Sequence, residues 1–345
     1  MIIFLSYLDH GVRAIRDGLP VIESLFLYVG FVFAGDRGSL EKLKKWLPRV
    51  FVACVFYSAL FPFGETIKTR SPIVVGSQGQ PIPIFGHFVT TPRLLMVAAA
   101  FALERYRREA AWRYLIFAAG AISMALVFIP SRTLLLIIFV LLIYFLFSGN
   151  RRLSFGLAWM TGISIVFFLV LLSLGIEGTR LGITSLSDYK TLFLEIFPGS
   201  ESTLTSGSSD RLRWWSAIYE RLTSSWKNLF FGLGYGIPLT DLRVGDVIVY
   251  TPHNTIVSVI GRGGLVAGLI FIWLQSVIIY RAWEIVRYLR HKKQDSSQFV
   301  ALLFILFAVL ITSIGEGPFI YPCFAVPYYF SAGILLRINW HKTVE

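Results

Sequence analysis

The chain has 345 residues, of which 55% are hydrophobic and only 15% are charged, and its formal net charge is +12. A soluble domain carries about 25% charged residues, so this composition excludes an ordinary water-soluble fold. The positive charge lies in short stretches between apolar runs, as in membrane proteins, and no separate basic module indicates nucleic-acid binding. We therefore predict an all-α, polytopic integral membrane protein built as a helical bundle.

Apolar runs of nearly membrane-spanning length recur along the chain. A hydrocarbon core about 30 Å thick requires about 20 residues of helix. We expect about nine spans, at residues 20–35, 49–63, 83–103, 112–129, 133–149, 154–175, 254–280, 299–315 and 318–337. The third is the weakest because Pro92 and Arg93 interrupt it, so it is expected to be short or broken. The spans together form a single transmembrane domain, residues 1–345.

Five basic stretches set the expected orientation of the spans. They are residues 36–49, 104–113, 150–152 and 281–293 and the tail that begins at Arg337. One alternating topology puts all five on the same side, which the positive-inside rule identifies as the cytoplasm. Residues 176–253 then form one long periplasmic loop.

Part of this long loop has the spacing of an amphipathic helix, within residues 211–236. Apolar side chains recur every three or four residues, with charged side chains between them. The apolar stripe consists of Leu212, Trp215, Ile218, Tyr219 and Leu222. We expect this helix to lie on the membrane face or on the bundle, and long loops that pack over a scaffold often carry function.

A histidine stands at the start of the seventh expected span. Thr251 is the expected N-cap and Pro252 the first helical residue, which puts His253 in the first turn. The positive end of the helix dipole disfavours imidazolium, so His253 is expected to be neutral near pH 7 and able to accept a proton from a hydroxyl. The alternative is a histidine that merely caps the helix at the membrane interface, and its position alone favours this structural role.

Two arginines lie on the same expected side as His253. Arg132 lies close after Pro130, where two apolar runs meet. An arginine in such surroundings either has a function or extends its side chain so that the guanidinium lies among the lipid headgroups. Arg211 begins the amphipathic helix, where an arginine is more often only a solvated charge. Taken together, two guanidinium groups and a neutral imidazole suit a pyrophosphate and an attacking hydroxyl, because arginine binds phosphate oxygens bidentately.

The outer segments contain no Asp-x-Asp pair, no His/Cys cluster and no glycine-rich phosphate loop with a lysine. We therefore expect neither a metal ion nor a cofactor.

Three motifs are similar, in the same order, to those of a known family. They are SRTLLLIIFV at 131–140, DRLRWWSAIYERLTSSWKNLFFGLGYG at 210–236 and HNTIVSVIGRGGLVAG at 253–268. They resemble the motifs of the O-antigen ligase/polymerase superfamily, and GHFVTTPRLLMVAAAF at 86–101 loosely resembles an earlier motif of that family.

The resemblance implies a metal-independent, inverting bacterial glycosyltransferase with many helices in the inner membrane. Its donor is an undecaprenyl-pyrophosphate-linked glycan on the periplasmic face, and its acceptor is another glycan repeat or lipid A–core. Arg132 and Arg211 would bind the pyrophosphate, His253 would activate the acceptor hydroxyl, and Asn254 would join substrate binding. The resemblance does not distinguish a ligase from a polymerase, or a role in O-antigen assembly from one in exopolysaccharide assembly.

The chain departs from the family in two ways. Many members have Glu where this chain has Arg262, and on a regular helix Arg262 would lie nearly opposite His253. Members usually have more spans ahead of the first motif, so the chain is either a short member or lacks the N-terminal spans. The alternative function is a membrane transporter or a flippase for lipid-linked glycans, for which Glu23 and Arg262 are the candidate ionisable residues.

Overall fold

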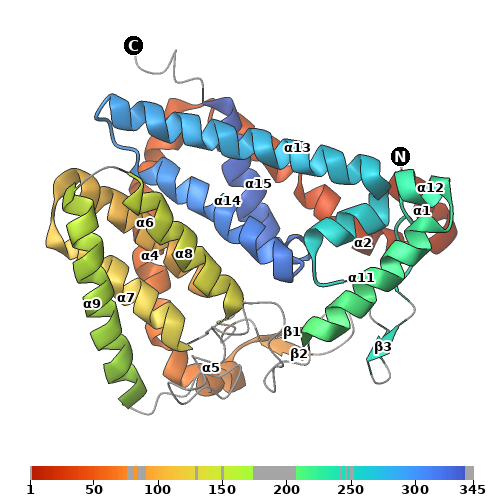
Figure 1. Cartoon of the computed structure of the whole chain (residues 1–345), viewed down its shortest axis with the longest axis horizontal. Helices are drawn as coiled ribbons and strands as arrows, with labels where there is room; N and C mark the ends of the chain where they lie inside the picture. The colour runs from red at the N-terminus through yellow and green to blue at the C-terminus, as the bar shows by residue number, and fades with distance from the viewer. Residues whose placement is uncertain are drawn as a thin grey trace. The chain divides into compact units, whose positions relative to one another are not determined.

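The computed structural model describes residues 2–75, 81–83, 85, 91–128, 131–148, 151–173, 207–240, 242–244, 247–248 and 252–338. Helices dominate this part of the chain (Figure 1), which confirms the all-α prediction. Two short antiparallel hairpins accompany them, β1 (Ile73–Val75) with β2 (Pro81–Pro83) and β3 (Arg243–Val244) with β4 (Val247–Ile248).

The chain divides into two compact units. Unit 1 consists of Met1–Ser39, Ser202–His291 and Ile305–Glu345, and unit 2 consists of Leu40–Glu201 and Lys292–Phe304. Helix α14 (Ser297–Gly315) contributes its first half to unit 2 and its second half to unit 1.

Unit 2 is a helical bundle with an alanine-rich centre. Its helices are α4 (Arg37–Ala59), the 3-10 turn η1 (Phe61–Phe63), α5 (Gly64–Arg70), α6 (Thr91–Glu109), α7 (Trp112–Phe128), α8 (Arg132–Leu146) and α9 (Arg151–Ser173). Helix α6 packs on α7, and both pack on α9. Fully buried alanines such as Ala99 and Ala118 allow this close approach, because small side chains let helix backbones come together.

Helix α6 differs from the broken span expected around Pro92 and Arg93. It begins at Thr91, so Pro92 lies in its first turn, where the missing N–H of proline costs no intrahelical bond. Arg93 is buried inside unit 2. The residues expected to begin this span, apart from Phe85, lie mostly outside the described part of the chain.

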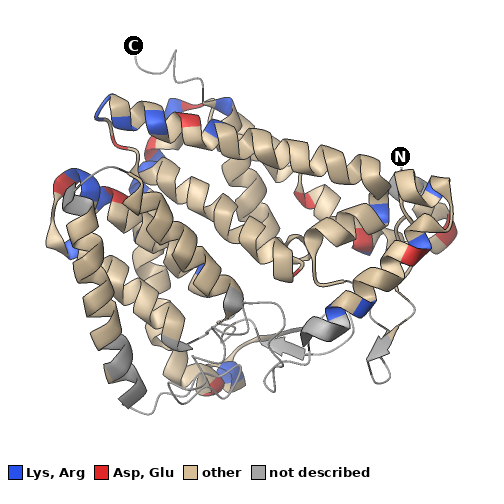
Figure 2. Cartoon of the chain, viewed as in Figure 1, with Lys and Arg blue, Asp and Glu red and all other residues tan. Residues whose placement is uncertain are grey.

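Helices run through the basic stretches that the sequence suggested were loops. Residues 37–49 begin α4, residues 104–109 end α6, and residues 281–291 end α13 (Thr255–His291). Figure 2 shows blue and red stretches of ribbon, which mark basic and acidic residues, together at the ends of α6 and α13. Pairs one turn apart, such as Arg105–Glu109 at 2.7 Å and Arg281–Glu284 at 2.9 Å, support these polar turns.

Unit 1 contains the N-terminal, central and C-terminal helices. They are α1 (Ile2–His10), α2 (Val12–Glu23), α3 (Phe26–Phe33), α11 (Gly207–Thr223), α12 (Trp226–Phe231), α13, the end of α14, the 3-10 turn η2 (Pro318–Ile320) and α15 (Pro322–Arg337). Helices α3 and α15 cross in direct backbone contact at Gly30 and Gly333, where any Cβ would collide with the partner backbone.

The first expected span, residues 20–35, is not one continuous helix. Helix α2 ends at Glu23 and α3 begins at Phe26, so α3 has only eight residues. The hydroxyl of Ser24 donates to the carbonyl of Val21 at 2.6 Å. The N–H of Ser24 still donates to the carbonyl of Pro20 at 3.2 Å, and Ser24 and Leu25 keep right-handed helical dihedral angles, so a helical turn joins α2 to α3.

Helix α13 contains a sharp break at Gly264, which has φ 72° and ψ −172°. Its first segment, residues 255–263, and its second segment, residues 265–291, run in different directions in Figure 1. The second segment still exceeds the roughly 20 residues that cross a bilayer.

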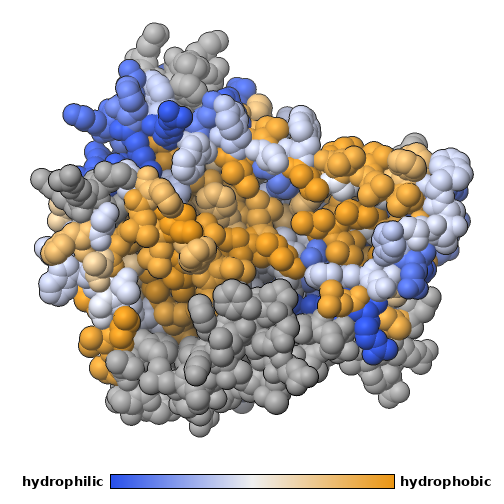
Figure 3. All heavy atoms as spheres, in the orientation of Figure 1, coloured by the Kyte–Doolittle hydropathy of each residue, from blue (hydrophilic) through white to orange (hydrophobic). Residues whose placement is uncertain are grey.

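The described helices support a membrane protein. Helices α13 and α14 are long and apolar enough to span a membrane, and Val12–Phe33 with Arg37–Ala59 pass the same test when taken together. Apolar side chains cover broad areas of the visible surface in Figure 3, and Leu269 and Trp273 of α13 are 68% and 65% exposed. Surfaces this apolar suit contact with lipid. The number of nine spans, the single-domain boundary and the periplasmic loop stay predictions.

Candidate functional site

The amphipathic helix is present as α11 and packs on the first segment of α13. Ile218 and Leu222 are 1% and 4% exposed and form a core with Leu239. Val257 and Ile260 of α13 pack against this core. Leu212 and Tyr219, expected in the same apolar stripe, are instead exposed. The contact stripe is narrower than expected because α11 touches a single short helical segment along this face.

Helix α13 begins later than the sequence suggested. Its first helical residue is Thr255, and Asn254 is the N-cap, with its Oδ1 accepting from the N–H of Val257 at 3.0 Å. Pro252 and His253 therefore precede the helix, and Thr251 lies outside the described residues. His253 has φ +50°, a left-handed conformation that interrupts a helix, and asparagine is among the best N-caps.

Asn254 connects α13 to α14 as well as capping its helix. Its Nδ2 donates to the carbonyl of Ile314 at 2.9 Å, and the side chain is almost fully buried. Both ends of the amide are thus engaged within unit 1. The substrate-binding role of Asn254 stays a prediction.

His253 and Arg211 lie close enough to interact electrostatically. The ring of His253 remains accessible to solvent, but its centre lies 5.6 Å from that of Trp214 on α11. Partial burial and the positive charge of Arg211 lower the pKa of His253, while the carboxylate of Glu316 opposes them. This agrees with the expected neutral imidazole, although the causes are desolvation and Arg211 rather than a position inside the first helical turn.

Trp215 fixes α11 beside the same turn. Its indole Nε1 donates to the carbonyl of Pro252 at 2.9 Å. Arg211, Trp214 and Trp215 therefore form one end of α11, and this end lies against the residues that precede α13. Their side chains and His253 make a cationic and aromatic surface suited to an anionic group beside a proton acceptor.

Arg132 belongs to unit 2. It is the first residue of α8, and Ser131 caps this helix by accepting a hydrogen bond from the N–H of Leu134 at 3.1 Å. The Arg132 side chain lies outside the described part of the structure. Its convergence with Arg211 and His253 stays a prediction.

Arg262 has partners that the sequence did not suggest. Its Nη2 lies 3.2 Å from Oδ2 of Asp17 on α2, and both side chains are buried. Its Nη1 also donates to the carbonyls of Gly234 at 3.1 Å and Ile237 at 2.5 Å. These partners agree with the expectation that Arg262 lies away from His253, but no local pattern pointed to Asp17, which lies far away in sequence.

An apolar groove of about 640 Å³ runs between α13 and α14 in unit 1. Phe271, Ile279 and Leu310 are among the residues that line it. Ile256 and Ile314 also line the groove. Ile256 follows Asn254 closely in sequence, and the carbonyl of Ile314 accepts a hydrogen bond from Asn254. The groove thus reaches the residues next to His253.

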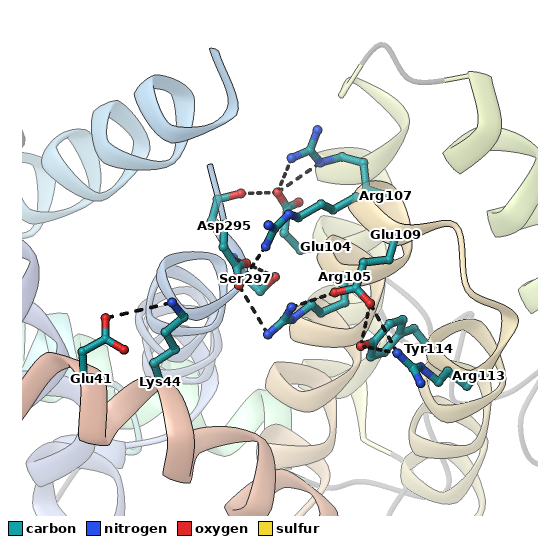
Figure 4. A network of polar contacts seen from close by, with 12 residues as sticks. Glu41, Lys44, Glu104, Arg105, Arg107, Glu109, Arg113, Tyr114, Asp295 and Ser297 are labelled. Carbon is teal, nitrogen blue, oxygen red and sulfur yellow. Dashed lines mark hydrogen bonds and ion pairs between the residues drawn. The ribbon is translucent and has the colours of Figure 1, made fainter. Parts of the chain in front are cut away.

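Unit 2 contains a separate network of charges (Figure 4). Asp295 pairs with Arg105 at 3.3 Å and Arg108 at 3.1 Å, and buried Glu104 pairs with Arg107 at 2.7 Å and accepts from Ser296. These contacts join the end of α6 to the turn before α14.

The carboxyl group of Asp295 is stabilised in its charged form. Burial by itself would raise the pKa of Asp295, but hydrogen bonds from Ser297 and the charges of Arg105 and Arg108 outweigh it and lower the pKa. At neutral pH the charged carboxylate of Asp295 therefore keeps its pairs with Arg105 and Arg108.

No three His, Cys, Asp or Glu side chains lie together as a metal-binding group within the described ranges. The metal-independent mechanism remains a prediction from sequence. No protein-family model matches the chain, and no curated protein matches it significantly.

Proposed function

We propose that the chain is a bacterial inner-membrane glycosyltransferase that acts on the periplasmic face. It moves a glycan from undecaprenyl pyrophosphate to an acceptor hydroxyl during assembly of O-antigen or exopolysaccharide, as a polymerase or a ligase. The proposal combines the order of the three motifs with the surface at the start of α13.

The observation that carries the proposal is the approach of α11 to the start of α13, where the ring of Trp214 lies 5.6 Å from the ring of His253. Arg211 is on the same helix, and its charge lowers the pKa of His253, so residues from two different motifs act at one place. A guanidinium beside a largely neutral imidazole supplies both a phosphate ligand and a proton acceptor.

The groove between α13 and α14 supports a lipid-linked donor. Its lining is apolar, and one end lies next to Asn254. A polyisoprenyl chain in this groove would leave its pyrophosphate near Arg211, at the boundary between apolar and polar surroundings. The pyrophosphate-binding role of Arg132 stays a prediction from its sequence motif.

The proposed reaction is a single displacement. The acceptor oxygen attacks the anomeric carbon, its proton passes to His253, and the bond from the anomeric carbon to the phosphate oxygen breaks. Undecaprenyl pyrophosphate leaves with the bonding electrons, and the arginines stabilise the charge that develops on it. Attack from the face opposite the leaving group inverts the anomeric centre.

Alanine substitutions of Arg211 and His253 test this proposal. Each should lower the rate of glycan transfer on the order of 10²–10³-fold, measured with membranes, lipid-linked donor and acceptor. Arg211→Lys should also be impaired, because a point charge does not replace a planar fork. Arg213→Ala is the matched control, since Arg213 is an exposed arginine on the same helix. Normal transfer by correctly inserted R211A and H253A proteins would refute the assignment.

A transporter or flippase is the second candidate, because of Glu23. Its side chain is 5% exposed, and neither carboxylate oxygen has a hydrogen-bond partner among the described residues. Glu23 also ends α2, and ionisable residues buried within membrane segments mark ion or substrate pathways. Uptake of a substrate or scrambling of lipid-linked glycan by reconstituted vesicles, abolished in Glu23→Ala and normal in R211A, would favour this function instead.

A further inference from the structure

Residues 232–236, here called the glycine loop, dock into the break of α13. The N–H of Leu233 donates to the carbonyl of Gly261 at 2.8 Å, and the N–H of Gly234 donates to the carbonyl of Arg262 at 3.1 Å. A helix break takes carbonyl groups away from their usual partners four residues later. The glycine loop supplies replacement donors, so the break and the loop form one unit of structure.

Glycine is required on both sides of this contact. Gly232 and Gly264 both have φ near +75° with an extended ψ, a region that other residues almost never adopt. A Cβ on Gly232 would collide with the backbone of Arg262, and a Cβ on Gly264 would collide with the backbone at Phe230. The two backbones therefore touch directly, which fixes the loop on the helix.

Asp17 and Arg262 extend this contact to a third element. Arg262 binds two carbonyl groups around the glycine loop, those of Gly234 and Ile237. Asp17 on α2 pairs with Arg262 at 3.2 Å and accepts from the N–H of Gly236 at 3.0 Å. The pair thus joins α2, the glycine loop and the end of the first segment of α13.

We propose that Asp17 and Arg262 are positioning residues that hold Arg211 at its distance from His253. The first segment of α13 is about 13 Å long, from nine residues at 1.5 Å each. Its far end is fixed by the Asp17–Arg262 pair, and its near end carries the Asn254 cap and His253. Helix α11, which carries Arg211, packs along the same segment through Ile218 and Leu222.

Loss of the pair would act on the site through this segment. Asp17 also pairs with Arg16 at 3.2 Å, but loss of Arg262 would take a charged donor away from the carbonyl groups of Gly234 and Ile237, so the break would rearrange rather than stay in place. The segment and α11 would then lose their common support, and Arg211 would move relative to His253. The chemical consequence rests on the proposed function, but the geometry itself can be measured without any enzymatic assay.

The titration of His253 reports this geometry. The charged groups that act on its ring are Arg211 from α11 and Glu316 after α14, and the ring of Trp214 covers part of it. Acylation of His253 by diethyl pyrocarbonate, followed at each pH by mass spectrometry of its peptide, gives the pKa in the membrane-embedded protein.

Four variants give the expected order of effects. Arg211→Ala should raise the midpoint of the His253 titration, which is its pKa, toward the ordinary value near 6.5. Asp17→Asn and Arg262→Gln should each move it in the same direction and no further than R211A, because they act only through Arg211 and its surroundings. Arg262→Lys should fall between R262Q and the parent protein, since it keeps the charge opposite Asp17 and loses the second donor.

Two further variants separate positioning from loss of stability. Glu104→Gln breaks a buried ion pair of unit 2 and should leave the His253 midpoint unchanged. The double variant D17N/R262M replaces the buried pair without leaving a lone charge, so it should fold even where R262Q does not, and it should still raise the midpoint.

The outcomes distinguish this proposal from the proposed function. An unchanged midpoint in D17N and D17N/R262M, with the expected shift in R211A, would overturn the positioning role and leave the enzyme proposal standing. An unchanged midpoint in R211A would mean that Arg211 does not act on His253, which overturns both. Loss of glycan transfer in D17N, together with the shifted midpoint, would support both.

Discussion

Replacement of Gly264 by alanine tests whether the break in α13 is a required feature of the fold. Gly264 has φ 72° and ψ −172°, and a Cβ there would collide with backbone atoms of Phe230 and Phe231. These neighbours are main-chain atoms rather than the flexible end of a side chain, so they cannot move aside without displacing α12.

The expected loss of stability has two parts. Holding alanine in a backbone region used almost only by glycine costs about 1–3 kcal/mol. Forcing an extra methyl group into an occupied space costs about 1–3 kcal/mol more. Gly264→Ala should therefore destabilise the protein by about 2–6 kcal/mol, a large part of the total stability of most domains.

Thermal unfolding of the purified protein in lipid nanodiscs measures this difference. Gly120→Ala is the matched control, because Gly120 lies in helix α7 with open space around its missing Cβ. That control should be neutral or more stable by up to about 1 kcal/mol, since alanine favours helix over glycine. Equal unfolding temperatures for G264A and the parent protein would refute the backbone contact described above.

Two further predictions concern pH. If neutral His253 accepts the proton, the acid side of the pH–rate profile follows its lowered pKa, so Arg211→Ala should move that side to higher pH and Glu316→Gln to lower pH. Steady-state rates across pH check this, and identical profiles would contradict it. The lowered pKa of Asp295 stabilises the fold above the unfolded value near 3.9, and this contribution disappears as the pH falls through the folded pKa. Asp295→Asn should therefore cost roughly 1–3 kcal/mol at pH 7 and progressively less as the pH falls below about 3.9, as thermal unfolding across this range will show.

Much of the architecture follows from local sequence. Long apolar runs predict helices, because each helix satisfies its own backbone hydrogen bonds without help from water or neighbours. The amphipathic spacing likewise identified α11 and its buried residues Ile218 and Leu222. It did not decide that Leu212 and Tyr219 would be exposed, since the width of the buried face depends on what packs against it.

The candidate site was only partly accessible to sequence reasoning. The His-Asn motif drew attention to His253 and Asn254, but it suggested that Thr251 was the cap and put His253 inside the helix. The structure gives the cap to Asn254 and a left-handed backbone to His253. Capping preferences allow several neighbouring polar residues, and the choice among them depends on partners such as the carbonyl of Ile314.

The sequence by itself determined that this protein is helical, apolar and basic at its polar turns, because composition and periodicity act on each segment separately. Tertiary structure alone decided the break at Gly264, the pairing of Arg262 with Asp17 and the contact of the Trp214 ring with His253. Each of these joins residues from distant parts of the chain, and buried charges take whichever partner the packed backbone brings within reach. A regular helical repeat carries no information about such partners, so it could separate Arg262 from His253 but could not show that Arg262 pairs with Asp17.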